Sequence, residues 1–300
     1  PLLSIYKVYL AEDSRLKRQV ALKVLPEHVR TDEDRLKRFR SEAEAAAQLS
    51  HPHIAHVYSI EEADDMLFIT MEYIDGQPIN RLIPEQGITM DTFLEWFYQI
   101  LEGLSHAHEK GVCHRDIKPS NMMVSKDGVP RILDFGLAHL TRPDLESNAV
   151  DSEVPTRSMA AILGSVAYMS PEQADNKTVS FASDVFSLGI VMYEALAGRR
   201  PFLGDSTFAI ASSILRDDPP VITAIRPDIS PHLGRLITKC LQKDVRRRYQ
   251  TAREVFIELR EVIDIINRPA EIVDPGAAMG LTPEDAAVSA PVTPVTAPAG

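Results

Sequence analysis

The sequence His114-Arg115-Asp116-Ile117-Lys118-Pro119-Ser120-Asn121, followed further along by Asp134-Phe135-Gly136, decides how this chain is interpreted. The Asp116 carboxylate can accept a proton from a hydroxyl group. The Asn121 amide and the Asp134 carboxylate are hard oxygen ligands of the kind that magnesium prefers. Together the two segments predict the floor of a phosphoryl-transfer site.

Composition limits the class of protein. The chain has 300 residues, of which 44% are hydrophobic and 25% charged, as in an ordinary globular protein. Its net charge of −11 argues against a nucleic-acid partner, because such binding needs a basic surface. No apolar run approaches the length of a membrane span. The chain opens with neither Met nor a secretory signal, so we expect a fragment or a processed chain.

The two cysteines, Cys113 and Cys240, lie far apart and outside any metal-binding spacing. This usage is typical of a reducing compartment, so we expect a cytoplasmic protein. Cys113 stands beside His114, which would suit an activated thiol. We favour the other interpretation, a buried small apolar residue.

The first part of the chain predicts a small sheet with one helix. Residues 8–10, 20–25, 56–60 and 66–72 are β-rich, and the charged segment 12–18 suits a hairpin turn. Apolar residues between Leu36 and Leu49 recur with helical spacing.

The rest of the chain predicts helices. Thr89 or Asp91 can cap the first of these, and Gly198 ends a nearly all-apolar helix over 182–197. Further helices are expected around 233–241 and 252–266. From about Pro269 the composition becomes rich in Pro, Ala and Thr, which predicts a disordered linker.

A small sheet lobe, a hinge and a helical lobe resemble the protein-kinase fold, and the motifs are similar to those of eukaryotic-like (Hanks-type) serine/threonine protein kinases of bacteria. The resemblance runs from about Val8 to Ile266. It implies an α+β, two-lobed fold. The implied bounds are a kinase domain over 1–268, with an N-lobe over 1–71, a hinge over 72–76 and a C-lobe over 77–268, and a disordered tail over 269–300.

The resemblance assigns roles to the polar residues. Lys23, in Val-Ala-Leu-Lys, would hold the α- and β-phosphates of ATP, and Glu42 would pair with it. Glu44 is the alternative partner, but it faces another side of the helix. Asp116 would act as the base, and Lys118 would neutralise charge on the transferred phosphoryl group. The implied ligands of Mg²⁺ are Asn121 and Asp134.

Adenine recognition is implied at the hinge. The residues implied to line this site are Val8, Ala21, Met71, Glu72, Ile74 and Met123. The Glu72 carbonyl and the Ile74 amide would contact the base.

Other matching residues are implied to be structural. His114 would pack beneath Phe135 with Val57 and Ala46 rather than take part in catalysis. Asp184 would bind the backbone of the catalytic loop. Glu172 is expected to pair with Arg248, and Ser165 to lie near Asp116.

Arg115, just before Asp116, implies regulation by phosphorylation of the segment between Asp134 and Glu172, because a phosphate can dock on such an arginine. Thr156 and Ser158 are the expected acceptors, with Thr141, Ser147 and Ser152 as alternatives. Autophosphorylation would bring two copies together, so a homodimer is an expected partner.

One motif of the family is missing. The glycines of the phosphate-binding loop would fall at Pro1, Leu3 and Tyr6, and none of these is glycine. Either the start of the chain does not belong to the domain, or the loop is lost. Losing its donors would cost about 2.7–4 kcal/mol of transition-state stabilisation, on the order of 10²–10³ in rate.

The sequence is compatible with three functions. The first is a serine/threonine kinase that uses Mg-ATP, phosphorylates proteins and itself, and acts in signal transduction. The second is a pseudokinase that serves as a binding scaffold, which only the missing glycines favour. The third, a small-molecule kinase, fits poorly with the long segment that Ser170-Pro171-Glu172 closes.

Overall fold

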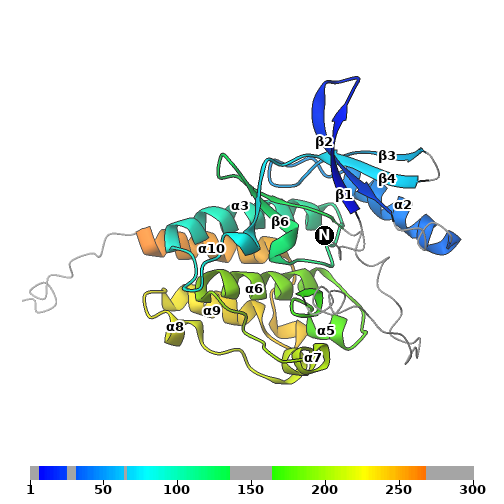
Figure 1. Cartoon of the computed structure of the whole chain (residues 1–300). Coiled ribbons are helices and arrows are strands. Elements are labelled where there is room, and N and C mark those ends of the chain that lie inside the picture. Colours follow the sequence, from blue (N-terminus) through cyan, green and yellow to red (C-terminus); the bar gives the residue numbers. More distant parts are fainter. Residues whose placement is uncertain (1–6, 26–31, 64–65, 136–163, 268–300) are drawn as a thin grey trace, which may run out of the picture.

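The computed structural model describes residues 7–25, 32–63, 66–135 and 164–267. A sheet lobe with one helix lies above a larger helical lobe (Figure 1). This architecture confirms the predicted α+β, two-lobed fold. Thr156, Ser158, the three glycine-loop positions and the tail over 269–300 lie outside the described residues.

The sheet lobe contains four antiparallel strands in the order β1-β2-β4-β3. They are β1 (Lys7–Asp13), β2 (Arg18–Val24), β3 (Val57–Ala63) and β4 (Met66–Glu72). The first turn is shorter than the predicted 12–18, since Glu12 pairs with Gln19 and Asp13 with Arg18 in the ladder. The turn closes early because Asp13 Oδ1 accepts hydrogen bonds from the Arg15 and Leu16 amides at 3.0 and 3.1 Å.

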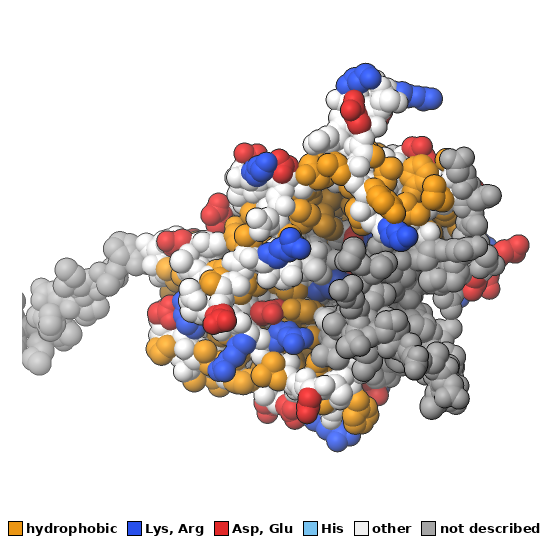
Figure 2. Space-filling model, in the orientation of Figure 1, with side chains coloured by type: hydrophobic (Ala, Val, Ile, Leu, Met, Phe, Trp, Pro, Cys, Tyr) orange, Lys and Arg blue, Asp and Glu red, His pale blue; other side chains and the backbone are white. Residues whose placement is uncertain are grey.

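Helix α2 (Glu33–Ala47) is the helix of this lobe. Its buried residues Phe39, Ala43 and Ala46 recur with helical spacing and join the hydrophobic core. The helix begins earlier than the first predicted apolar position, with Glu33 and Asp34 in its first turn, where negative charge favours a helix N-terminus. Figure 2 shows hydrophobic side chains over this lobe, below the charged tip of the β1–β2 hairpin.

The helical lobe is built around α6 (Phe181–Ala197), which is buried along nearly its whole length. The other helices are α3 (Met90–Glu109), α5 (Pro171–Ala174), α7 (Thr207–Arg216), α8 (Ile222–Ile225), α9 (Pro231–Cys240) and α10 (Ala252–Asn267). Thr89, not Asp91, caps α3, since Thr89 Oγ1 accepts from the Thr92 amide at 3.3 Å. Gly198 ends α6 at φ +69°, and a Cβ there would lie 1.9 Å from the Glu85 carbonyl oxygen.

A second, three-stranded sheet lies between the lobes and was not predicted. Its strands are β5 (Gly76–Pro78), β6 (Met122–Ser125) and β7 (Pro130–Ile132), with the short 3₁₀ helices η1 (Ile79–Arg81) and η2 (Pro119–Asn121) nearby and η4 (Val245–Arg247) further on. The Ala55 amide, just before β3, donates to the carbonyl of Ile132 in β7 at 2.9 Å. This hydrogen bond connects the second sheet to the segment that leads into the first. In the described part of the chain, no helix combines the length and apolarity that a membrane crossing requires.

Candidate active site

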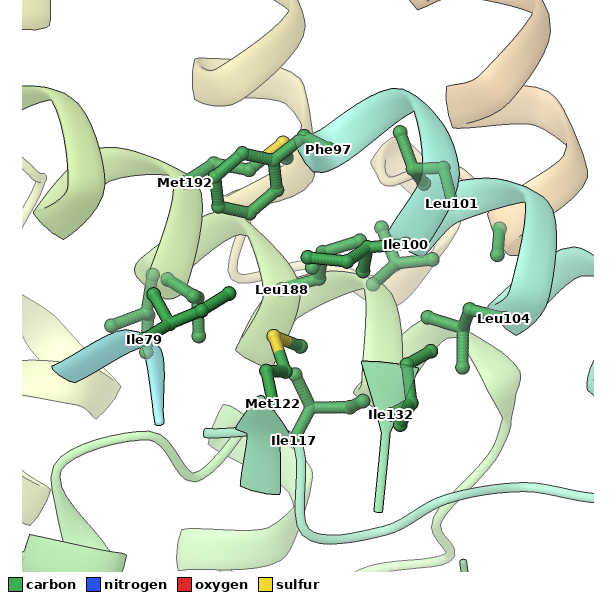
Figure 3. Packing of buried hydrophobic residues seen from close by; sticks show 14 of the residues in the cluster. Ile79, Phe97, Ile100, Leu101, Leu104, Ile117, Met122, Ile132, Leu188 and Met192 are labelled. Atoms are coloured by element: carbon green, nitrogen blue, oxygen red, sulfur yellow. The ribbon is translucent and has the colours of Figure 1, made fainter. Parts of the chain in front are cut away.

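The catalytic loop is anchored by Ile117, which is only 1% exposed. Its side chain lies among core residues that include Met122, Leu104 and Leu188 (Figure 3). Burying such a side chain contributes about 1.5–3 kcal/mol. Because Ile117 is held in the core, its two neighbours Asp116 and Lys118 are held at the edge of the core.

Asp184, on α6, fixes the backbone of the same loop. The His114 amide donates to its Oδ2 and the Arg115 amide to its Oδ1, both at 2.7 Å, which confirms the expected role. Burial works against ionisation of this carboxyl, but the hydrogen bonds that it accepts, from His108 at 3.0 Å and from the His114 amide, outweigh burial and lower its pKa. Arg115 has a φ of +65°, which costs a residue with a Cβ about 1–2 kcal/mol.

The three residues that the sequence placed in the catalytic loop meet in one cluster. Lys118 Nζ lies 2.6 Å from Asp116 Oδ2. Asn121 Nδ2 donates to the same oxygen and to the Asp116 main-chain oxygen, both at 2.9 Å. Lys118 Nζ also donates to Ser165 Oγ at 3.3 Å, so Ser165 lies beside the catalytic loop, as expected. Two donors therefore hold the Asp116 carboxylate in one orientation.

Lys23 and Asp134 join the two lobes at the site. Lys23 lies on β2 and Asp134 follows β7, and Lys23 Nζ is 2.9 Å from Asp134 Oδ1. Lys23 is only 3% exposed, so its ammonium depends on a charged partner in this environment. Asp134 adopts a φ of +61°, an uncommon value for an aspartate. A lysine of the sheet lobe and a carboxylate of the helical lobe thus meet, as predicted.

The expected pair of Glu42 with Lys23 is wrong for this structure. Glu42 Oε1 instead accepts a hydrogen bond from Arg115 Nη1 at 2.9 Å, while Oε2 is buried with no hydrogen-bond partner among the described residues. The physical reason is that Asp134 and Glu42 compete for Lys23. Asp134 supplies the carboxylate beside Lys23, and the Arg115 side chain reaches Glu42 instead. Burial raises the pKa of Glu42, and Arg115 opposes that shift only in part.

The residues implied to bind adenine lie on elements that flank the junction of the lobes. Val8 stands opposite Lys23 in the β1–β2 ladder, and Ala21 stands opposite Met71 in the β2–β4 ladder. The remaining three are Glu72 at the end of β4, the buried Ile74 just after it, and Met123 on β6. Val8 exposes 56% of its surface, so an apolar side chain is open to contact there.

His114 is structural, as expected. It is fully buried, its ring centroid lies 4.7 Å from that of Phe135, and its Nε2 lies 2.7 Å from the Leu133 carbonyl oxygen. Val57 and Ala46 are buried in the same hydrophobic core. Cys113 Sγ lies 3.3 Å from Asp184 Oδ2, and burial raises the pKa of this thiol, so the activated-thiol alternative fails.

Glu172 and Arg248 form the predicted buried pair. Arg248 Nη1 and Nη2 lie 2.8 and 3.2 Å from the two carboxylate oxygens, and Ser183 Oγ donates to Glu172 Oε1 at 2.6 Å. Burial alone would raise the pKa of Glu172, but these donors outweigh it and lower the pKa.

Two side chains near the site were not expected from the sequence. His108, on α3, binds Asp184 and accepts from the Ala252 amide at 3.1 Å. Gln173 donates to the Arg115 carbonyl at 2.8 Å. The pattern Ser170-x-x-Gln173 is a capping box that could have drawn attention to Gln173, whereas nothing near His108 in the sequence marks it.

Asn121 and Asp134 fit a magnesium ion by their chemistry. Both hydrogen bonds of the Asn121 side chain use its amide nitrogen, which leaves the carbonyl oxygen for a cation. Asp134 contributes a carboxylate, the other ligand type that Mg²⁺ prefers. Within the described ranges, no group of three or more His, Cys, Asp or Glu residues suits a metal ion, so any such site would be completed by phosphate oxygens and water.

A sheet lobe that carries a buried lysine, set against a helical lobe that carries the aspartate–lysine–asparagine cluster, defines the class of two-lobed phosphoryl-transfer enzymes. Comparison with known proteins identifies the family. The sequence model of the protein kinase domain family matches residues 4–258. The chain therefore belongs to the protein kinase family.

Its relatives narrow the type. The chain is 38% identical over 261 residues to the serine/threonine-protein kinase PknB of Mycolicibacterium smegmatis, an alignment that covers 85% of this chain and 40% of the relative. It is 36% identical over 258 residues to the serine/threonine-protein kinase PrkC of Bacillus subtilis, with 86% and 38% covered. The domain is thus of the bacterial Hanks type, and the chain spans about 40% of the length of these relatives.

Solved structures agree on the fold. The kinase domain of PknI from Mycobacterium tuberculosis superimposes with a TM-score of 0.66 at 25% identity, covering 87% of this chain and 92% of that one.

Proposed function

We propose that this domain transfers the γ-phosphoryl group of ATP to serine and threonine hydroxyls of proteins. The observation that carries the proposal is the meeting of Lys23 with Asp134 across the lobes, beside a loop in which Asp116, Lys118 and Asn121 are bonded together. The similarity to PknB and PrkC supports the same activity.

Asp116 orients the attacking hydroxyl and accepts its proton. Its Oδ2 is held by Lys118 and Asn121, so one carboxylate oxygen remains for the substrate. The Lys118 ammonium, 2.6 Å from Asp116, also lies where it can offset negative charge on the group in transfer. Ser165, bonded to Lys118, brings the substrate-side segment next to the same loop.

Lys23 binds phosphate oxygens of the nucleotide, since a buried ammonium acts as a point charge for them. Asn121 and Asp134 would hold Mg²⁺, which neutralises phosphate charge when bound. Met71 and Ile74 with Val8, Ala21, Glu72 and Met123 supply the adenine site. Glu42 acts on this site through its bond to Arg115 in the catalytic loop.

The setting of the domain is also a proposal. Both cysteines are unpaired thiols, which supports a cytoplasmic location where Mg-ATP is abundant. We propose that the kinase domain extends over 1–268 and is followed by a tail over 269–300. A second copy of the chain is a partner for autophosphorylation at Thr156 or Ser158, whose phosphate Arg115 would bind. The net charge of −11 argues against a nucleic-acid partner.

The test is phosphate transfer from γ-labelled ATP to the chain itself and to casein, by the wild type and by Asp116→Asn. We expect Asp116→Asn to lose on the order of 10²–10⁴ in rate, because general-base catalysis supplies a factor of that size. Asp127→Asn, in an exposed turn, is the matched control and should keep full activity. Equal transfer by the wild type and Asp116→Asn rules the proposal out.

A pseudokinase scaffold is the second candidate, because Pro1, Leu3 and Tyr6 stand where the family has glycines. Mg-ATP that binds the folded domain raises its melting temperature by mass action. We expect a shift for the wild type and none for Lys23→Met. No shift and no transfer by the wild type would support the scaffold.

A further inference from the structure

The peptide group between Arg115 and Asp116 is held by a side chain of α5. The Gln173 side chain, on α5, donates from Nε2 to the Arg115 carbonyl oxygen at 2.8 Å. A peptide group is planar, so fixing its oxygen fixes the orientation of the whole plane. The Asp116 nitrogen and Cα lie in this plane, so its orientation helps to set the position of the Asp116 side chain.

The other peptide group of Arg115 is held from a different element. Asp184 Oδ1, on α6, accepts from the Arg115 amide at 2.7 Å. The two bonds lie on the two sides of the Arg115 Cα, where the backbone has a left-handed φ of +65°. A residue with a Cβ leaves this conformation readily when its neighbours release it. Asp184 and Gln173 together keep it there.

The orientation of the Gln173 amide is settled by its second contact. Gln173 Oε1 accepts a hydrogen bond from the Ser170 main-chain amide at 3.0 Å. Ser170 Oγ in turn accepts one from the Gln173 main-chain amide at 3.3 Å. Since the oxygen end of the amide meets an N–H group, the nitrogen end must face the Arg115 carbonyl. The Ser170 main-chain amide thus aims the Gln173 donor at the catalytic loop, beyond the local role of the capping box at the start of α5.

We propose that Gln173 is a positioning residue for the phosphoryl-transfer step, acting through the Arg115–Asp116 peptide group on the direction of Asp116. Its segment also carries Ser165, which is bonded to Lys118, so the stretch that leads into α5 meets the catalytic loop at two points. The catalytic geometry therefore depends on how this stretch lies. The inference rests on the proposed kinase activity.

The experiment compares Gln173→Leu, Gln173→Glu and Ser170→Ala. Gln173→Leu removes the donor, and we expect kcat to fall on the order of tenfold, with KM for Mg-ATP within about twofold of wild type, because a small misplacement of a catalytic group lowers the rate without weakening nucleotide binding. Ser170→Ala removes the other half of the capping box and leaves the bond to Arg115. It should lower the melting temperature and keep kcat.

Gln173→Glu gives a readout that a structural role would not produce. The introduced carboxyl can donate to the Arg115 carbonyl only when protonated. Its kcat, divided by that of the wild type, should rise as the pH falls from about 7 towards about 4.5, near the ordinary glutamate pKa, while the ratio for Gln173→Leu stays constant.

Three outcomes overturn the inference: wild-type kcat in Gln173→Leu, an equal loss of kcat in Ser170→Ala, or a ratio for Gln173→Glu that does not rise. The failure of the proposed function looks different, since wild type and Asp116→Asn would then transfer phosphate equally. A kinase that is active and indifferent to Gln173 would refute only the inference.

Discussion

Two charged pairs, Glu172–Arg248 inside the helical lobe and Glu42–Arg115 between α2 and the catalytic loop, differ in burial and in whether every carboxylate oxygen has a hydrogen-bond donor. Glu172 and Arg248 have side chains 5% and 0% exposed, and both carboxylate oxygens have donors. Glu42 and Arg115 are 21% and 37% exposed, and Glu42 Oε2 has no hydrogen-bond partner in the described part of the chain.

This difference separates charges that hold the molecule together from charges that can exchange partners. A buried pair with all its atoms bonded cannot lose one member without leaving the other unsatisfied. A partly exposed pair can open more easily, because water can replace the lost partner. The helical lobe therefore provides a fixed platform, and the contact of α2 with the catalytic loop is the adjustable part of the site.

The largest effect should follow from Arg248→Met. The change leaves the Glu172 carboxylate buried without its main donors, and it also removes the bond from Arg248 to the Ala182 carbonyl at 2.7 Å. Breaking a buried pair in this way costs about 3–5 kcal/mol of the free energy of unfolding. Urea unfolding followed by circular dichroism measures it.

Arg246→Met is the matched control for that experiment. Arg246 is bonded to Asp244 at 3.0 Å, but its side chain is 89% exposed. Its loss should leave the unfolding midpoint unchanged. If both arginine variants unfold at the same urea concentration, the contrast between buried and exposed pairs is wrong for this domain.

Acid should remove part of the same stabilisation. The pKa values of Glu172 and Asp184 are lowered in the folded state, from ordinary values of 4.5 and 3.8. A carboxyl whose folded pKa is depressed stabilises the fold fully above its unfolded pKa, and this contribution is lost as the pH falls through the folded value. The melting temperature should thus decline below about pH 4.5. Glu172→Gln should decline less steeply, and an equally steep curve would contradict the assignment.

The catalytic cluster could be predicted because it is local in sequence. Asp116, Lys118 and Asn121 lie within one short loop, so their spacing alone places them near each other. Strands and helices that are apolar over most of their length, such as β4 and α6, were also predicted within a few residues. These elements need no knowledge of distant neighbours.

What the sequence could not predict depends on tertiary placement. Whether Glu42 meets Lys23 or Arg115 is decided by where α2 lies relative to the catalytic loop. Nothing in the local sequence indicates the pairing of Glu42 with Arg115. Gln173 reaches across 58 positions to the Arg115 carbonyl, although its capping box is local. The strands β5 and β7 have three residues each, too few to show an alternating pattern.

The smallest effect on stability, and the sharpest test of the contrast, should come from Glu42→Gln. Burial raises the pKa of Glu42, so the ionised carboxyl is a cost to the fold that grows as the pH rises through the interval above 4.5. Removing the charge should change the free energy of unfolding at neutral pH by less than about 1 kcal/mol, and upward rather than downward. Phosphate transfer should nevertheless fall on the order of tenfold, because a neutral amide weakens the 2.9 Å bond to Arg115 of the catalytic loop, and a small displacement of that loop lowers the rate.

Glu44→Gln serves as its control, since Glu44 lies on the exposed side of α2 and should affect neither stability nor activity. Stability is measured by urea unfolding and activity by transfer from labelled ATP. A loss of stability as large as that of Arg248→Met would show that Glu42 and Arg115 brace the fold as Glu172 and Arg248 do. Unchanged stability with reduced transfer would show that this carboxylate is kept for its part in the reaction, at a site where the fold itself does not need it.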